Sequence, residues 1–517
     1  MSERRFPIGL LLIAPVALGF AVYAFTGQAQ VLDPDATATI EADDTATRSP
    51  FWSEMDTAIA AENTADALNP QSTATERPTS TPTATSTPGP QARRGDFGEG
   101  AWVRVNAGEG DCLNARNQPS LASEWVIVNA CLPHGFEGYV SGEAQNADGH
   151  WWWFIAGAGW VAEDYLEYAG DVDIRARTLP ELAGRGMIAF LRQDAAYNTS
   201  IWVMNTDGSG QRLVRAGRAN EHPSDVGWSP DGGSLTFSLP RLDGSDPTAW
   251  DIHILPVDGA AETVIENAYG VAWSPDGVTF GTVADARVEG MSGLNGVPAV
   301  VNAATGERRV YGTQRSWLQA PLSFNHDGTK LLVTYSDWEN GDDPGPRFMV
   351  WDLEGNEIAR VEAPADTYYA SPIWSPVEDR IMFHAGSAQG QPQYAVYDLD
   401  RRDIVAGARV PKASDKIGGK CGSWNMWAAA WSRDGGSVLY SFDSGETGAN
   451  GIWVWDLASG AQSLVPAIAT SNASAGPDGY ATFSSHGGGS SGYIFIAAPG
   501  GGWPLLLTDG TSPVWGP

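Results

Sequence analysis

A short phrase returns at a nearly constant interval through the last two thirds of the chain. Its fullest copies read VGWSPDG, which ends at Gly232, and VAWSPDG, which ends at Gly277. The tryptophan of the phrase, or the residue in its place, recurs at Trp228, Trp273, Phe324, Trp374, Trp431, Ala475 and Trp515. Intervals of 40 to 57 residues match the length of one four-stranded blade of a β-propeller. The repeat therefore predicts a propeller over residues 186–517.

Each repeat contains the parts of one blade. An apolar strand ends at the tryptophan, the SPDG turn follows, and three further strands come after it, such as LTFS and IHILPV. Seven copies predict seven blades, or six if the worn copy at Ala475 is not a blade. The last copy stands at the C-terminus, whereas the strand at 187–190 has no copy before it. We therefore expect Val514 and Trp515 to pair beside residues 186–191 and to close the ring.

The WSPDG phrase with a following DG turn resembles the β-propeller repeats of the TolB family. The resemblance covers residues 186–517 and is most specific at the copies that keep the tryptophan. It implies an interaction scaffold outside the cytoplasm. TolB itself has a different N-terminal domain and typically six blades, so the resemblance does not imply TolB's own partner.

Residues 97–168 predict a separate small β unit. The segments WVRV, WVIV and WWWFIAG are separated by Gly, Asn and Pro, which indicates short strands and turns. Together with CLNARNQPS, LPHG, GWV and DYL, they resemble the bacterial SH3-like family in the family's order. The resemblance implies a small barrel that binds cell-wall peptides or glycans, or that serves as a spacer. Alternate strand residues face the core, so we expect the run Trp151, Trp152 and Trp153 to be mainly core.

The three cysteines of the chain allow at most one bridge. Cys112 and Cys131 lie 19 residues apart within the small β unit, so we expect a disulfide between them in an oxidising compartment. Cys421 stands alone. The sequence has no CxxC pair, and no metal site or cofactor is predicted.

An uncharged stretch at the N-terminus bears on the compartment. Residues 6–25 carry no charge and follow Arg4 and Arg5. As a helix they would span about 30 Å, the thickness of a bilayer core. The basic residues favour a cytoplasmic N-terminus with the rest outside. We expect a retained membrane anchor within residues 1–30; the alternative is a signal peptide cleaved near Gly27 and Ala29.

Two further segments read as linkers, and the charge balance excludes one class of partner. Residues 31–96 are acidic and then rich in Ser, Thr and Pro, which predicts a disordered spacer. Residues 169–185 are expected to link the small unit to the propeller. With 62 acidic and 31 basic residues the chain has a net charge of −31, which argues against nucleic-acid binding.

The loops that lead into the innermost strands should surround the channel mouth on the face with the longer connections. Three of the four lysines of the chain stand in one of these loops, together with two tryptophans. A cationic, aromatic patch on an acidic protein suits an anionic or sugar-containing ligand, or an acidic loop of a partner. The alternative is that the tryptophans plug the channel and the lysines are solvated. The candidate binding residues are Arg315, Trp317, Tyr368, Tyr369, Lys412, Lys416, Lys420, Trp424 and Trp427.

The sequence favours binding over catalysis. The run at 488–492 fits GxSxG formally, but it lies in a Gly/Ser stretch without the helix that a nucleophile elbow needs. We therefore expect a non-enzymatic, membrane-anchored envelope protein with an envelope protein partner. Peptidoglycan is a second expected partner. The alternative is a propeller-based glycan lyase or hydrolase with its site at the channel mouth.

Overall fold

The fold is all-β throughout the described part of the chain. The computed structural model describes residues 97–122, 126–241, 249–285, 296–311, 316–318, 322–337, 347–362, 367–387, 393–409, 429–442, 451–466, 470–486, 492–499 and 503–517. Every regular element in these residues is a strand or a short 3-10 helix, and none of their helices is long and apolar enough to cross a membrane. The predicted anchor and the predicted spacer at 31–96 lie outside these residues.

The N-terminal part, residues 97–171, forms two sheets and is called the module below. Its strands are β1 (Ala101–Val105), β2 (Cys112–Arg116), β3 (Val126–Pro133), β4 (Glu137–Tyr139), β5 (Gln145–Ala147), β6 (His150–Ile155), β7 (Gly159–Ala162) and β8 (Leu166–Asp171). The 3-10 helix η2 (Glu163–Tyr165) precedes β8. One sheet has the order β4-β1-β8 and the other the order β3-β2-β7-β6-β5. A disulfide joins Cys112 to Cys131, with their Cα atoms 5.4 Å apart.

The closed barrel expected for the module does not form. Among the described residues, the bridge between Val140 and Ile155 is the one place where the backbones of the two sheets pair. At this crossing Gly138 lies so close to Ile155 that a Cβ atom on it would stand 2.5 Å from the Ile155 side chain. The core between the sheets includes Trp152 and Trp153, which are 1% and 0% exposed. The expectation that the tryptophan run is mainly core is therefore confirmed for these two residues.

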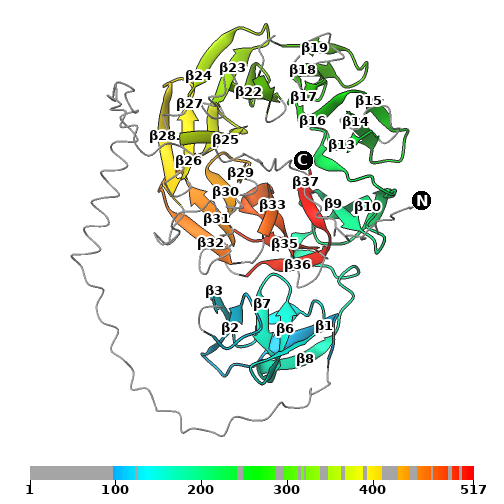
Figure 1. Cartoon of the computed structure of the whole chain (residues 1–517), viewed down its shortest axis with the longest axis vertical. Coiled ribbons are helices and arrows are strands. Elements are labelled where there is room, and N and C mark those ends of the chain that lie inside the picture. Colours follow the sequence, from blue (N-terminus) through cyan, green and yellow to red (C-terminus); the bar gives the residue numbers. More distant parts are fainter. Residues whose placement is uncertain are drawn as a thin grey trace, which may run out of the picture. The chain divides into compact units, whose positions relative to one another are not determined.

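Residues 187–515 contain seven antiparallel sheets in the described part of the chain, arranged around a common centre (Figure 1). Each is one blade of a propeller. The first three blades are β9 (Met187–Gln193), β10 (Thr199–Asn205) and β11 (Arg212–Arg215) with β37 (Thr511–Trp515); β12 (Ser224–Trp228), β13 (Ser234–Pro240), β14 (Trp250–Pro256) and β15 (Thr263–Ile265); and β16 (Ala268–Trp273), β17 (Thr279–Ala284), β18 (Val297–Asn302) and β19 (Arg308–Val310). The strand order follows the chain in six of the seven blades, and in the first blade the C-terminal strand β37 takes the innermost place beside β9.

The next four blades continue this order. They are β20 (Ser316–Leu318), β21 (Ser323–Phe324), β22 (Lys330–Asp337), β23 (Arg347–Asp352) and β24 (Glu357–Val361); β25 (Thr367–Trp374), β26 (Arg380–Ser387), β27 (Gln393–Asp398) and β28 (Asp403–Arg409); β29 (Ala429–Trp431), β30 (Ser437–Phe442), β31 (Gly451–Asp456) and β32 (Gln462–Pro466); and β33 (Thr470–Ala475), β34 (Ala481–His486), β35 (Gly492–Ala497) and β36 (Leu505–Asp509). Two short 3-10 helices, η3 (Pro180–Leu182) and η4 (Pro477–Gly479), lie before the first blade and inside the seventh.

The repeated phrase explains how neighbouring blades hold together. In three copies the indole N–H of the tryptophan donates to a backbone carbonyl of the innermost strand of the preceding blade. The Nε1 to O distances are 3.0 Å from Trp228 to Val514, 3.3 Å from Trp374 to Ser323 and 3.0 Å from Trp431 to Ile373. The turn glycines Gly232 and Gly277 have φ of 69° and 70°, a region in which glycine alone is unstrained.

The ring closes where the sequence predicts. Strand β37 pairs with β9, with Trp515 opposite Ile188 and Val514 opposite Ala189. The worn copy at Ala475 forms a complete blade, so the described residues form seven blades. Gly476 replaces the serine of the phrase there, and a Cβ atom on it would lie 2.6 Å from the Trp515 ring. The repeat has lost its usual residues at the point where the closing tryptophan packs.

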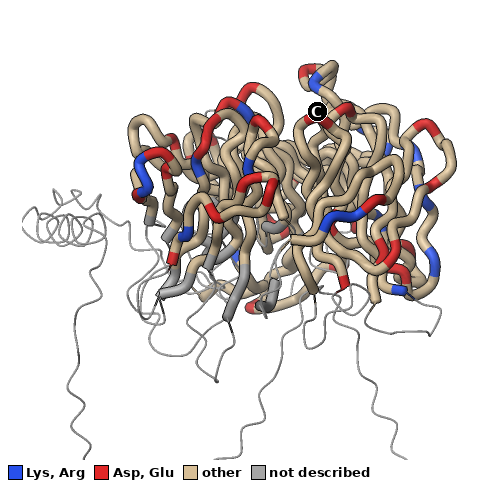
Figure 2. Tube along the Cα trace, turned by 90° about the horizontal axis from the view of Figure 1, so that it is seen from above, with Lys and Arg blue, Asp and Glu red and all other residues tan. Residues whose placement is uncertain are grey.

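Short turns gather on one face of the propeller, and many carry Asp or Glu (Figure 2). Several of these carboxylates cap their own turns. The Asp231 carboxylate accepts the backbone N–H of Gly233 at 2.9 Å, and the Asp434 carboxylate accepts that of Gly436 at 3.0 Å. Hydrogen bonds from the Ser229 and Ser432 hydroxyl groups, both at 2.6 Å, and then those from the backbone N–H groups hold the pKa of the two carboxyl groups below their usual value. Much of the acidity on this face therefore stabilises turns.

Candidate functional site

The outward face of the sheet β4-β1-β8 carries two aromatic residues. Along β1 the residues Ala101, Val103 and Val105 are buried in the module, so Trp102 points to the other side. Tyr139 of β4 lies directly opposite Trp102 in the pairing register. The module thus presents an aromatic pair on a sheet face that its own core does not use.

The seventh blade covers this aromatic face. The Tyr139 ring lies 5.7 Å from the Tyr493 ring between centroids, and the Tyr493 hydroxyl donates to Ser141 Oγ at 2.8 Å. The β6–β7 turn also touches the blade, because a Cβ atom on Gly157 would stand 2.7 Å from the Phe495 ring. Burial raises the pKa of Tyr139 to about 12. The module is therefore packed against the propeller along β35.

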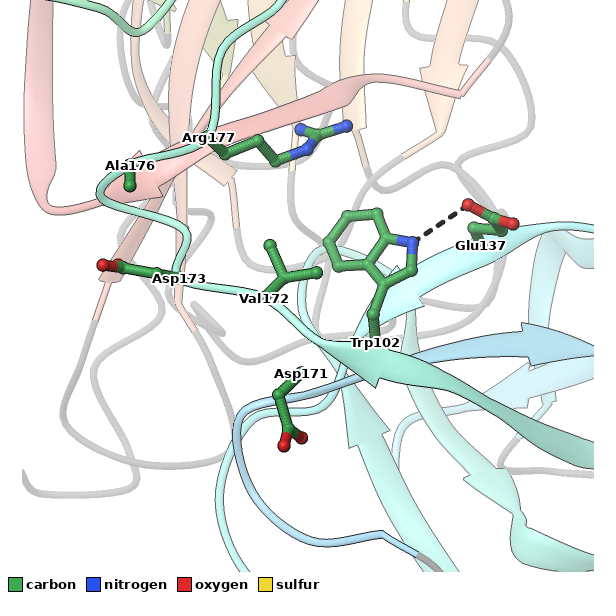
Figure 3. Close-up of a pocket in the computed structure, with 7 residues that line it drawn as sticks. All are labelled: Trp102, Glu137, Asp171, Val172, Asp173, Ala176 and Arg177. Atoms are coloured by element: carbon green, nitrogen blue, oxygen red, sulfur yellow. Dashed lines mark hydrogen bonds between the residues drawn. The ribbon is translucent and has the colours of Figure 1, made fainter.

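A shallow cavity of about 480 Å³ opens at this junction and is called the junction pocket below. Figure 3 shows Trp102 between Glu137 and the segment that leaves β8. The residues that line it are Trp102, Glu137, Asp171, Val172, Asp173, Ala176 and Arg177. The pocket is open to solvent, and both the module and the following segment contribute to its wall.

Glu137 is fixed as an ionised carboxylate at the rim of the junction pocket. Its Oε1 accepts hydrogen bonds from the Arg104 Nε at 3.0 Å and the Arg104 NH2 at 2.6 Å. Its Oε2 accepts the indole N–H of Trp102 at 3.0 Å. These donors, Arg104 first, lower the pKa of Glu137. The edge of the indole is oriented by the same carboxylate.

Arg177 supplies a fixed cation on the opposite side of the pocket. Its guanidinium carbon lies 4.9 Å from the centroid of the Trp102 ring, within the range of a cation–π interaction. The guanidinium also donates to the backbone carbonyl of Leu506 in β36. Burial lowers the pKa of Arg177. Trp102 is therefore held at its edge by Glu137 and at its face by Arg177.

The junction pocket combines the groups of a binding site. It offers an indole ring, the Arg177 cation, the ionised Glu137 and the exposed carboxylates Asp171 and Asp173. Such a set can hold a ligand with apolar and polar parts, such as a peptide or a sugar, by stacking and hydrogen bonding.

Most candidate residues at the channel mouth lie outside the described residues. Trp317 lies on β20 opposite Ser336 and Tyr368 lies on β25 opposite Gly386, with only their backbones described. The residues that lie outside altogether are Arg315, Lys412, Lys416, Lys420, Trp424 and Trp427. Their placement at the mouth stays a prediction.

Tyr369 belongs to the core between the fourth and fifth blades. Its side chain is 2% exposed, and its ring centroid lies 4.5 Å from that of Phe383 and 6.2 Å from that of Phe348. A ligand-binding role for this ring at the channel mouth does not fit its position. The presence of an aromatic residue at this position of β25 is explained by packing between the fourth and fifth blades.

Sequence reasoning missed the junction pocket and the role of the segment after β8. Trp102 reads as one more strand aromatic in WVRV, and Arg177 stands in an expected linker. The pattern does contain a signal, since the buried Val103 and Val105 force Trp102 outward. The seventh blade covers that face, with Tyr493 lying 352 positions after its partner Ser141, and local patterns cannot show such a contact.

Comparisons with known proteins bear on the fold alone. No protein-family model matches the chain, and no curated protein matches it. Among solved structures, TolB from Acinetobacter baumannii is 14% identical, with 73% of this chain and 82% of that chain covered and a TM-score of 0.40. The β-propeller domain of the Trilobed protease from Pyrococcus furiosus is 15% identical, with 64% and 94% covered and a TM-score of 0.44. The chain is similar to these propellers, and its blades are assigned from its own repeats and sheets.

Proposed function

We propose that this chain is a non-enzymatic, membrane-anchored protein of the cell envelope that works as a binding scaffold. Its module is SH3-like and binds cell-wall peptide or glycan, and its propeller binds an envelope protein. One observation carries the proposal: the module is packed onto the seventh blade through Tyr139 and Tyr493. Two binding surfaces on one rigid support can hold two partners in a fixed geometry.

The compartment is inferred from three features of the chain. The disulfide between Cys112 and Cys131 is favoured in an oxidising environment. The uncharged stretch 6–25 after Arg4 and Arg5 favours export of all that follows. The net charge of −31 suits a soluble ectodomain that is repelled by anionic lipid.

The first test is co-sedimentation of the full-length chain with purified cell-wall sacculi. Removing the whole module would uncover Tyr493 and Phe495, so a point variant is preferable. Ala176→Trp places a bulky ring in the junction pocket from an exposed position, and Ala195→Trp is the matched control in the exposed β9–β10 turn. We expect the wild type and Ala195→Trp to pellet and Ala176→Trp to lose at least about tenfold in affinity. If no form pellets, wall binding is excluded.

The propeller's part is tested at the channel-mouth loop. Changing Lys412, Lys416 and Lys420 to glutamate one at a time should weaken capture of an envelope partner in steps, because a scaffold spreads binding over several contacts. A lyase or hydrolase would instead lose glycan turnover almost completely with one mouth substitution. Glycan cleavage by the wild type, abolished by a single change, would overturn the scaffold proposal.

A further inference from the structure

The segment between the module and the first blade is part of the folded core. Residues 172–186, called the clasp below, overlap the linker expected at 169–185, yet Ile174, Leu179 and Leu182 are only 7%, 7% and 1% exposed. A flexible spacer is solvated along its length, so three buried side chains in so short a segment are not typical of one. The clasp therefore packs against the folded parts of the protein at both of its ends.

The first half of the clasp belongs to the junction of the module with the seventh blade. Ile174 is in the same apolar cluster as Phe495 and Leu506, and Val172 packs against that cluster. Arg177 adds its hydrogen bond to the Leu506 carbonyl. The clasp thus leaves the module along the outer strand of the blade on which the module is docked.

The second half of the clasp lies at the closing seam between the seventh and first blades. Leu179 and Leu182 share a cluster with residues of both blades and of the closing strand. The members from the blades are Ile188, Phe190, Met204, Ile494, Ile496, Leu507 and Trp515. The Trp515 indole N–H donates to the Arg185 carbonyl at 3.0 Å, and Thr206 Oγ1 donates to the Leu182 carbonyl at 2.7 Å.

Charge pairing joins the first half of the clasp to the closing seam at Asp509, the last residue of β36. Arg175 of the clasp donates to both carboxylate oxygens of Asp509, at 2.9 and 2.6 Å. Arg192 of β9 lies 2.9 Å from the same carboxylate and is 8% exposed. One carboxylate at the bend into β37 therefore holds an arginine from the clasp and an arginine from the first blade.

We propose that the clasp couples docking of the module to closure of the propeller, so that the two open together. The apolar cluster at the module junction and the cluster at the closing seam share this one short segment. Loosening the module's interface should displace the clasp and weaken the pairing of β37 with β9. Coupling between two sites is reciprocal, so weakening the seam should also loosen the module.

The test is amide hydrogen exchange of the full-length chain. Tyr139→Ala removes a docking contact that lies outside the module's own core, and Tyr165→Ala, at an exposed position of η2, is the matched control. We expect Tyr139→Ala to raise exchange at least about tenfold in residues 187–193 and 511–515, with 279–302 in the third blade unchanged. The control should match the wild type throughout. Faster exchange confined to 136–141 and 492–497 would overturn the coupling.

A second variant keeps the test decisive if Tyr139→Ala unfolds the chain. Arg175→Ala removes the bidentate pair with Asp509 from a side chain that is 60% exposed. The coupling predicts faster exchange both at 511–515 and at 136–141 in the module interface, with partial rescue by Arg175→Lys. Faster exchange at 511–515 alone shows that the seam opens without the module, and the proposal is then wrong.

Discussion

The closing seam of the propeller and the seam between the fifth and sixth blades are built differently. At the fifth and sixth blades, Trp431 donates to Ile373, and the Tyr394 ring lies 4.4 Å from the Tyr440 ring. At the closing seam Trp515 likewise donates to a carbonyl, but Asp509 and two arginines are added. The fifth and sixth blades are each built from one continuous part of the chain, whereas the first blade is completed by β37, which follows β36 through Gly510 and joins β9 by strand pairing and not through a turn. The blade that is completed by two separate parts of the chain is thus held by contacts beyond the repeated phrase.

Deleting residues 513–517 should have the largest effect on this comparison. The deletion removes Val514 and Trp515, and with them most of the pairing with β9 and the acceptor of the Trp228 indole. We expect the cooperative thermal transition of the whole propeller to be lost, because both ends of the ring are freed. Deletion of Pro517 alone, which is exposed, is the control. Unchanged thermal unfolding of the larger deletion would contradict the closure.

Asp509→Asn should come next in size, because it leaves Arg192 buried without its charge partner. Breaking one side of a buried pair costs about 3–5 kcal/mol, measured as the free energy of unfolding in urea. Asp478→Asn breaks the pair with Arg185 at a carboxylate that is 75% exposed and serves as the control. A loss at Asp509 no larger than in the control would show that the seam does not depend on this charge.

The two seams should also differ in their response to acid. Burial lowers the pKa of His384 in the fifth blade to about 4. The unfolded chain then takes up the proton first, so stability should be lost as pH falls from about 6.5 to about 4, by about 1.4 kcal/mol for each pH unit. His384→Gln should flatten this slope, while His222→Gln at an exposed site should not.

The closing seam should resist that pH range. Burial raises the pKa of the Asp509 carboxyl, but Arg175 and Arg192 outweigh it and leave the pKa below its ordinary value. The stability from Asp509 is present above the unfolded pKa and is lost only as pH falls through the lower folded value. Exchange at 511–515 should therefore stay slow at pH 5, when the region of His384 has begun to loosen. Faster exchange at 511–515 first would reverse the comparison.

Trp431→Phe should give the smallest change. It removes the 3.0 Å hydrogen bond to the Ile373 carbonyl while keeping an aromatic ring in the seam. We expect a loss of about 1–2 kcal/mol in the free energy of unfolding, with no change in exchange at the closing seam. Tyr197→Phe, at an exposed turn, provides the reference. A loss as large as that of Asp509→Asn would remove the distinction between the two seams.

Local patterns in the sequence were sufficient to predict the propeller, the length of its blades and the place of closure. The SPDG turn, the glycine angles at Gly232 and Gly277 and the alternation of each strand are local properties, and they repeat once per blade. The worn copy at Ala475 left six or seven blades open, because its glycine is explained only by the Trp515 ring that packs on it. The spacing of Cys112 and Cys131 in the sequence was also sufficient to predict their disulfide.

The way in which the module, the clasp and the last blade meet depends on contacts between residues far apart in the chain. Arg175 and Asp509 are 334 residues apart in the chain, and Ser141 and Tyr493 are 352 apart. A sequence pattern shows that Trp102 faces outward and that Leu182 is apolar, but not which surface covers them. Those surfaces exist only after the ring has closed and brought the seventh blade beside the first, so the junction pocket and the clasp follow from long-range packing.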